Sequence, residues 1–207
     1  MKTIYNHNLV TISGPQGCGK STTMEALKVL VKEQGLPITV DDFKVSRAVQ
    51  AARGGVLTDA TKDFPTMLEF QRAISRARTR YEDDVLPDTM SKIVVMERGF
   101  ADIAAYFRLW VEKLQPEEFY RPMIDDFVND CRTQAKFTQM SLYLPFMDHV
   151  KFEADANRAA ESDVSRFNEL LLDELSQPVY ANAQATIEGK TPEQRAQSII
   201  DSIKHLL

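Results

Sequence analysis

The sequence predicts an α/β fold in which helices cover both faces of a parallel, mostly five-stranded sheet. Short apolar runs of strand length alternate with helical patterns along the chain, and this alternation is typical of parallel sheets with crossover helices. The chain has 207 residues, and neither an internal repeat nor a low-complexity linker divides it. We therefore expect one domain over residues 1–207.

The elements are predicted in order from these local patterns. Strands are expected over residues 8–13, 36–40, 92–97, 139–144 and 184–188, which are short runs bounded by polar or turn residues. Helices are expected over residues 22–34, 43–52, 66–85, 102–114, 116–136 and 161–175. Gly35 ends the first of these helices. The last helix begins after Thr191, the predicted N-cap, with Pro192 at its first position.

Residues 14–21 read Gly-Pro-Gln-Gly-Cys-Gly-Lys-Ser and match the pattern G-x-x-x-x-G-K-[ST] at every fixed position. In this motif the glycines let backbone N–H groups point at phosphate oxygens, and the following helix adds the positive end of its dipole. Lys20 would reach the β- and γ-phosphates, and the Ser21 hydroxyl would bind Mg²⁺. We therefore expect a nucleoside triphosphate site formed by Gly14, Gln16, Gly17, Cys18, Gly19, Lys20, Ser21 and Thr22.

Composition weighs against several other kinds of protein. The net charge of −5, from 25 basic and 30 acidic residues, argues mildly against a dedicated nucleic-acid binder. No apolar run approaches the ~20 residues of a membrane span, and no signal-peptide pattern follows Met1. The two cysteines fit a reducing compartment, and no Cys/His cluster has metal-ligand spacing. We expect a cytoplasmic protein without a membrane partner, and a homodimer is compatible with these features.

The apolar strand over residues 92–97 ends in a carboxylate followed by an arginine. Ligands of parallel sheets bind at the carboxyl ends of the strands. Glu97 therefore suits the orientation of Mg²⁺ and its waters, and Arg98 suits a contact with the transferred phosphoryl group or a substrate phosphate. Asp102 follows near a helix start and would contact substrate. The alternative makes Glu97 and Arg98 an ordinary turn and Asp102 a helix cap.

Asp41 and Asp42 follow the second predicted strand. A carboxylate at this position would accept the proton of an acceptor hydroxyl as a general base. The alternative role is to cap the next helix. We favour Asp42 as the base and place Asp41 in the substrate site.

The helix predicted over residues 66–85 has arginines at i, i+4 and i+8, namely Arg72, Arg76 and Arg80. These three side chains share one side of the helix. They would bind phosphates of the acceptor, or they would form a solvated face that pairs with neighbouring carboxylates. Gln71 lies beside them, and its amide would read the edge of a nucleobase.

Residues 148–160 show little periodicity, and we expect a lid over residues 148–166. A closing lid excludes water and supplies positive charge to the γ-phosphoryl group. Arg158 would take this role, and Arg166 on the following helix would contact substrate. The alternative is that both are surface charges paired with nearby carboxylates.

Together these residues resemble the P-loop kinases of the nucleoside and nucleotide kinase group. The run from Glu97-Arg98 to Asp102 and Tyr106 is similar to the E-R-S segment of deoxynucleoside kinases and to the D-R-x-x-x-D-x-x-x-Y segment of ribosylnicotinamide-kinase-like enzymes. The pair Phe70-Gln71 resembles the pair at which deoxynucleoside kinases hold the base. Asp42 with Arg47 matches the acidic residue and following arginine of both groups. Residues 189–195 look like the region packed beside the adenine.

This resemblance implies a P-loop NTPase fold of three α/β/α layers with a short lid, and ATP with Mg²⁺ as cofactors. It also implies transfer of the γ-phosphate to a nucleoside- or nucleotide-like acceptor, with Arg47 among the substrate contacts. Glu97 departs from the aspartate of thymidylate-type enzymes, and Gly99 replaces the serine of deoxynucleoside kinases.

Two alternatives stay open at this point. In the first, the acceptor lies within a nucleic acid, as a hydroxymethylated base or a strand end, and the row of three arginines supports it. In the second, the protein is a nucleotide-binding switch or an NTPase without an acceptor. The chain contains neither an N-K-x-D nor a D-x-x-G motif of guanine-nucleotide switches.

Overall fold

The computed structural model describes residues 8–54, 61–84, 91–146, 161–181 and 184–207. Its centre is a five-stranded sheet in the order β2-β3-β1-β4-β5, and every neighbouring pair of strands is parallel. The strands are β1 (Asn8–Ser13), β2 (Ile38–Asp41), β3 (Ile93–Glu97), β4 (Met140–Tyr143) and β5 (Gln184–Thr186). The predicted parallel, five-stranded sheet is confirmed.

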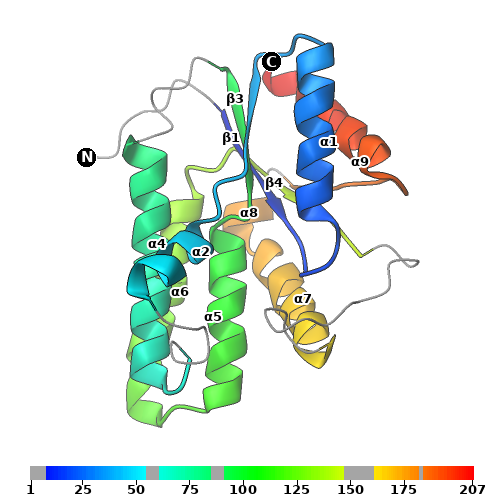
Figure 1. Ribbon diagram of the computed structural model, residues 1–207. Helices are drawn as coiled ribbons and strands as arrows, with labels where there is room; N and C mark the ends of the chain where they lie inside the picture. Colours follow the sequence, from blue (N-terminus) through cyan, green and yellow to red (C-terminus); the bar gives the residue numbers. More distant parts are fainter. Residues whose placement is uncertain (1–7, 55–60, 85–90, 147–160, 182–183) are drawn as a thin grey trace.

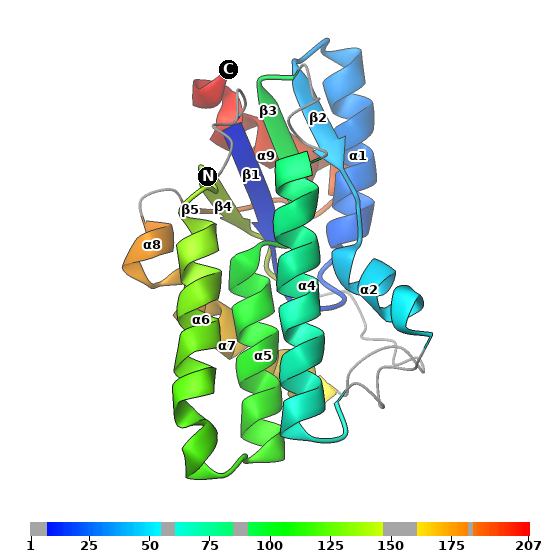
Figure 2. The same ribbon diagram turned by 90° about the vertical axis from the view of Figure 1, so that its left-hand side faces the viewer.

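Helices cover both faces of this sheet (Figures 1 and 2). One face is covered by α1 (Lys20–Glu33) and α9 (Pro192–Ile203), which pack against each other. The other face is covered by α4 (Phe64–Asp84), α5 (Phe100–Leu114) and α6 (Arg121–Ala135). The predicted arrangement in three layers is therefore confirmed. Within the described segments, no helix combines the length and apolarity needed to cross a bilayer.

Shorter or peripheral elements complete the fold. The helix α2 (Val45–Arg53) packs against α4, and α7 (Glu161–Leu175) packs against α5. A four-residue helix, α8 (Pro178–Ala181), lies beside α6 and was not predicted. Two 3₁₀ turns are η2 (Glu118–Tyr120) and η3 (Lys204–Leu206). The helix predicted over residues 116–136 is thus divided between η2 and α6.

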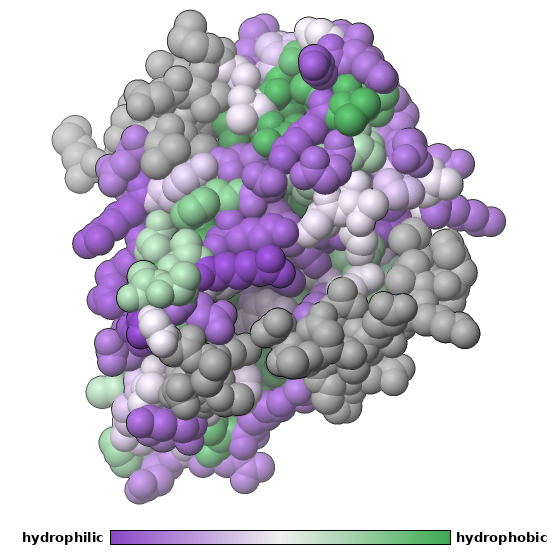
Figure 3. Space-filling model, in the orientation of Figure 1, coloured by the Kyte–Doolittle hydropathy of each residue, from purple (hydrophilic) through white to green (hydrophobic). Residues whose placement is uncertain are grey.

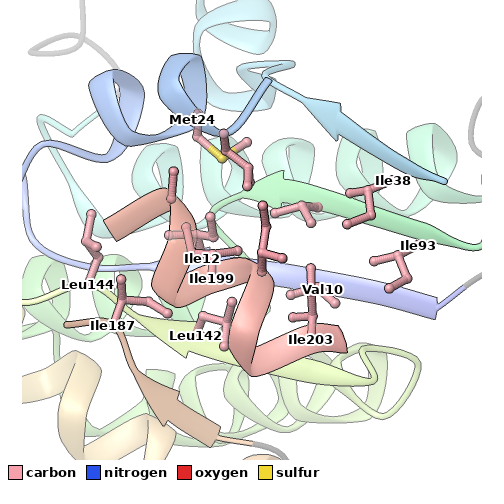
Figure 4. Close-up of a cluster of buried hydrophobic side chains, with 14 of the residues drawn as sticks. Val10, Ile12, Met24, Ile38, Ile93, Leu142, Leu144, Ile187, Ile199 and Ile203 are labelled. Atoms are coloured by element: carbon pink, nitrogen blue, oxygen red, sulfur yellow. The ribbon is translucent and has the colours of Figure 1, made fainter. Parts of the chain in front are cut away.

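Alternate side chains of the central strands point to opposite faces of the sheet. On the side of α1 and α9, Val10, Ile12 and Leu142 join a buried cluster with Met24 and Ile199 (Figure 4). On the opposite side, a smaller cluster of Leu9, Val94 and Met96 is covered by Tyr81 of α4. Because both faces of the sheet are buried, β3 carries four apolar residues in a row, from Ile93 to Met96.

The ends of two helices show how local polar groups decide element boundaries. The predicted N-cap of α9 is confirmed, since Thr191 Oγ1 accepts a hydrogen bond of 3.3 Å from the Gln194 N–H. The helix α5 was predicted to begin at Asp102, but it begins two residues earlier, at Phe100. Its start is capped from inside, because the Asp102 carboxylate accepts a hydrogen bond of 3.0 Å from the Gly99 N–H.

The helices α5, α6 and α7 and the first half of α4 extend beyond the carboxyl ends of the strands (Figure 2). This extension has its own buried cluster, which includes Phe107, Phe127 and Phe167. The carboxylate of Glu174 is fully buried in it and accepts two hydrogen bonds from Arg132, at 2.7 and 2.9 Å. A third contact of 3.5 Å comes from Arg108. Glu174 therefore joins α5, α6 and α7.

We predict that replacing Arg132 with Met destabilises the protein by about 3 kcal/mol, because the buried carboxylate of Glu174 loses its main partner. The double variant Arg132→Met, Glu174→Leu should regain most of this loss, since no buried charge remains. Urea unfolding followed by circular dichroism measures both. Arg121→Met, which breaks an exposed pair with Asp125 on the same helix, is the control and should change stability by no more than about 0.5 kcal/mol. Equal stability of wild type and Arg132→Met would contradict the prediction.

Candidate functional site

The phosphate-binding motif forms a tight loop between β1 and α1. Gly17 and Gly19 have φ angles of 85° and 90°, in the left-handed region that favours glycine. A Cβ atom on Gly14 would lie only 2.4 Å from the carbonyl oxygen of Leu144, so the loop can pass the end of β4 only without a side chain there. Cys18 is buried beneath the loop, and Gln16 is partly buried. Ser21 and Thr22 lie in the first turn of α1, and both are exposed.

Lys20 is the first residue of α1, and its side chain turns back under the loop. Its ammonium group donates hydrogen bonds to the carbonyl oxygens of Gly14, at 2.8 Å, and Pro15, at 2.7 Å. Burial lowers the pKa of Lys20, and the nearby charge of Arg98 adds to this effect. A phosphate group at the loop would offer Lys20 a charged partner in place of neutral carbonyl oxygens.

The phosphate loop after β1 and the end of β3 bring together Ser21 and Glu97, the two predicted magnesium ligands. Ser21 Oγ donates a hydrogen bond of 3.3 Å to Glu97 Oε2. Mg²⁺ prefers oxygen ligands and keeps several of its waters, so one hydroxyl and one carboxylate beside a triphosphate fit this ion. Among the described residues, no cluster of three or more His, Cys, Asp or Glu side chains has the geometry of a metal site. Waters and phosphate oxygens would have to complete the coordination.

Lys44 also reaches this pair of oxygens and was not predicted as a site residue. Its Nζ lies 3.3 Å from Ser21 Oγ and 3.9 Å from Glu97 Oε2. Lys44 stands in the connection between β2 and α2. The contact therefore places a positive charge from the β2 side next to the phosphate loop.

Arg98 is held rigidly at the end of β3. Its φ angle of 63° lies in the left-handed region, which is uncommon for a residue with a side chain, and its N–H donates to the Ile12 carbonyl at 2.9 Å. The guanidinium group lies over the ring of Tyr106, with 5.1 Å to the centroid. Burial alone would lower the pKa of Arg98, but Tyr106 and the carboxylates of Asp102 and Glu97 raise it overall. Arg98 is a fixed cation close to the phosphate loop.

Both carboxylate oxygens of Asp102 are bound by the protein itself. Oδ2 accepts hydrogen bonds from Ser13 Oγ at 2.6 Å and from the Gly99 N–H at 3.0 Å. Oδ1 accepts from Arg98 at 3.0 Å. Asp102 is 1 % exposed. Its contacts position Arg98 and cap the start of α5. Its predicted substrate contact finds no support in this geometry.

The two adjacent aspartates face different helices. Asp42 is exposed and pairs with Lys28 of α1 at 2.9 Å, and this hydrogen bond lowers the pKa of Asp42. Asp41 accepts hydrogen bonds from the Tyr81 hydroxyl of α4 at 2.5 Å and from the Phe43 N–H at 2.8 Å. Burial and the hydrogen bond to Asp41 raise the pKa of Tyr81, so this hydroxyl remains a proton donor. Asp41 is therefore the aspartate held on the side of α4.

The helix α4 divides its polar residues between the interior and the surface. Gln71 is buried, whereas Arg72, Arg76 and Arg80 are exposed along one side of the helix, as the spacing predicted. Arg78, between them, is buried and forms an ion pair of 2.6 Å with Glu82. Arg47 is exposed on α2, which packs against α4.

Of the two arginines predicted in the lid, Arg158 and Arg166, the structure describes only Arg166. Arg158 lies outside the described residues. Arg166, on α7, is exposed and donates to both oxygens of Glu112, at 2.7 and 2.8 Å, and also to Glu169. These hydrogen bonds raise the pKa of Arg166. Its contacts are therefore those of a paired surface charge, which was the alternative interpretation of the sequence.

Sequence reasoning missed two residues that contact the candidate site, and it named Arg195 only as the end of the segment 189–195. Lys44 and Tyr81 have no motif around them, and the only signal for Lys44 is its place two residues after Asp42. Arg195 is almost fully buried and donates to the carbonyl oxygen of Cys18 at 2.7 Å. Figure 3 shows hydrophilic side chains gathered across the middle of the molecular face where, in Figure 1, the strands end.

Comparisons with known proteins agree with this fold. The model of a family described as an AAA domain matches residues 9–195, which is most of the chain. No curated protein matches the sequence at a significant level. Among solved structures, a thymidylate kinase from Candida albicans has a TM-score of 0.62 and 15% identity, and the match covers 98% of this chain and 93% of that one.

Crystal structures of NadR proteins are also similar. One, in complex with NAD and AMP-PNP, has a TM-score of 0.60 and 14% identity. Another, in complex with NR, has a TM-score of 0.58 and 15% identity. Each match covers 97% of this chain but only 49% or 50% of the NadR chain, so the present chain spans about half of those proteins. The chain therefore belongs to the AAA-domain family, and its fold is that of the P-loop nucleoside and nucleotide kinases.

Proposed function

We propose that this protein is an ATP- and Mg²⁺-dependent kinase that transfers the γ-phosphate to a nucleoside- or nucleotide-like acceptor. One observation supports this most directly. The phosphate loop, the pair Glu97–Arg98 and Asp41 all lie at the carboxyl edge of one parallel sheet. The similar structures add support, since they are a thymidylate kinase and NadR proteins in complex with NAD and AMP-PNP or with NR. We place the enzyme in the cytoplasm.

The donor side of the site would bind the triphosphate. N–H groups of the loop and the Lys20 ammonium would bind the β- and γ-phosphates. Ser21 and Glu97 would hold Mg²⁺, which would supply positive charge against the negative charge of the phosphates. Lys44 and Arg98 add positive charge from the β2 and β3 sides. Electrostatic stabilisation of this kind is the main contribution a protein makes to phosphoryl transfer.

The acceptor side would be formed by α2, α4 and the end of β2. We assign the general base to Asp41 and not to Asp42, because Asp42 is exposed and paired with Lys28. Asp41, oriented by Tyr81, would accept the proton of an acceptor hydroxyl. Gln71, Arg47, Arg72 and Arg76 remain the proposed acceptor contacts. Arg158, which lies outside the described residues, keeps its proposed role of stabilising the charge on the transferred phosphoryl group.

A second acceptor class has one observation in its favour. Arg72, Arg76 and Arg80 form an exposed basic row on α4, which would suit the backbone of a nucleic acid. The deciding experiment is transfer from γ-labelled ATP with Mg²⁺ to a panel of acceptors. The panel contains nucleosides, nucleoside monophosphates, nicotinamide riboside, and DNA with and without hydroxymethylated bases. Label in a small acceptor supports the proposal, label only in DNA supports the second class, and label only in free phosphate contradicts both.

We predict that Lys20→Ala lowers phosphoryl transfer at least about 100-fold, because the variant loses the charge that binds the β- and γ-phosphates. The fold should persist, which far-ultraviolet circular dichroism would show. Lys32→Ala, an exposed lysine on the same helix, is the matched control and should keep wild-type turnover. Wild-type turnover in Lys20→Ala would refute the role of this residue.

We predict that Glu97→Gln raises the Mg²⁺ concentration needed for half-maximal ATP binding by about 10-fold or more, since the variant loses a charged oxygen ligand. Titration of ATP binding with MgCl₂ by calorimetry measures this shift. Binding of ATP without Mg²⁺ should change little. An unchanged Mg²⁺ midpoint would exclude Glu97 from the metal site.

We predict that Asp41→Asn lowers kcat with a hydroxyl acceptor by about 100-fold or more, since the variant removes the base. Asp42→Asn, the adjacent control, should keep kcat within about 3-fold, because Asp42 is an exposed partner of Lys28. Steady-state kinetics on the acceptor found in the panel compares the two. The reverse order of effects would return the base to Asp42. A large effect of Asp41→Asn on KM alone would indicate that Asp41 only binds the acceptor.

A further inference from the structure

Arg195 joins three segments that lie far apart in the sequence. It stands in the first turn of α9 and is 2 % exposed. Its guanidinium group donates to the carbonyl oxygens of Cys18 at 2.7 Å, Gly189 at 3.0 Å and Pro145 at 3.1 Å. These carbonyls belong to the phosphate loop, to the connection from β5 to α9, and to the segment that follows β4.

The charge of Arg195 has an unusual environment. In the described part of the chain, no carboxylate forms an ion pair with this guanidinium group, and its partners are neutral carbonyl oxygens. Arginine remains protonated in proteins, so an almost fully buried positive charge lies directly behind the phosphate loop. Burial of an unpaired charge is costly. Phosphate on the other side of the loop would supply the missing negative charge.

The contact with Cys18 has a defined electronic consequence. The carbonyl of Cys18 and the N–H of Gly19 belong to the same peptide group. A charged donor on the carbonyl oxygen polarises that peptide and makes its N–H a stronger hydrogen-bond donor. In a loop of this type, such N–H groups are the ones that bind phosphate oxygens. Arg195 can therefore influence phosphate binding without touching the nucleotide.

Gly189 shows that this arrangement is tightly packed. Its φ angle is 128°, and a Cβ atom there would lie 2.8 Å from the backbone nitrogen of Arg195. The turn before α9 thus closes directly onto the helix start that presents Arg195. The guanidinium group is held by three backbone carbonyl oxygens.

We propose that Arg195 is a positioning residue that sets the affinity of the phosphate loop for polyphosphate groups through the Cys18–Gly19 peptide. The inference rests on the proposed function only to the extent that the loop binds a nucleoside triphosphate. It does not depend on which acceptor is used or on whether transfer occurs. Arg195 also connects the loop to the segment that follows β4, through Pro145, and to the connection from β5 to α9, through Gly189.

The test compares wild type with Arg195→Met and Arg195→Lys by calorimetry with ATP and with adenosine, without any acceptor. Arg195→Met should weaken ATP binding about tenfold or more, in line with the loss of a hydrogen bond from a charged group. Adenosine binding should change by less than about twofold, because adenosine has no phosphate. Arg195→Lys keeps the positive charge, so its affinity for ATP should lie between those of wild type and Arg195→Met. The Gly19 amide resonance in nitrogen-15 spectra should shift in Arg195→Met.

Ile199→Val, a fully buried change on the same helix, is the control for loss of stability. It should lower the melting temperature without altering ATP affinity. Unchanged ATP binding in Arg195→Met, or an equal loss for ATP and adenosine, would overturn the inference. If Arg195→Met fails to fold, Arg195→Lys provides the same comparison. A wild type that binds ATP but transfers no phosphate would contradict only the proposed function, whereas a wild type that binds no ATP would contradict both.

Discussion

The parallel pairing of β1 with β3 and β4 is the constraint on which the candidate site depends. In this register Ile12 is paired with Glu97, and Ser13 is paired with Tyr143. The phosphate loop therefore leaves the sheet at the same height as Glu97, whose carboxylate accepts a hydrogen bond from Ser21. A shift of one residue would turn the side chain of Glu97 to the other face of the sheet. The cores on both faces oppose such a shift, because it would exchange side chains of different size and shape between two close-packed clusters.

Buried polar groups then hold this edge of the sheet in one conformation. Asp102 binds Ser13, Gly99 and Arg98, so it joins the ends of β1 and β3 to the start of α5. Arg195 joins the phosphate loop to the ends of β4 and β5. A buried polar group without partners is costly, so each such network stabilises a single arrangement. These networks hold the backbone of the site in place, while Lys44, which is only partly buried, contacts Ser21 and Glu97 from the β2 side.

The sequence-based expectations were accurate where a feature depends on residues close together in the chain, and less accurate where it depends on contacts between distant residues. Local signals were reliable: the N-cap at Thr191, the bounds of α7 and the strand–loop–helix unit around Lys20 all agree with the structure. Boundaries set by tertiary contacts were less accurate, as at the start of α5, where the Asp102 side chain caps the helix from inside. The choice between Asp41 and Asp42 depended on Tyr81 and Lys28, which are distant in sequence. No local pattern shows which carboxylate each of them meets.

The sequence by itself determined the fold class and the phosphate loop, because periodicity, capping and glycine spacing are local properties of the chain. It also placed Glu97 and Arg98 at a strand end, where ligands of parallel sheets bind. Only the tertiary structure decided how these groups are used. It paired Arg166 with surface carboxylates, enclosed Asp102 within the protein, and brought Lys44, Tyr81 and Arg195 to the site. Those contacts arise from strand order and helix packing, which join residues that the sequence separates by tens of positions.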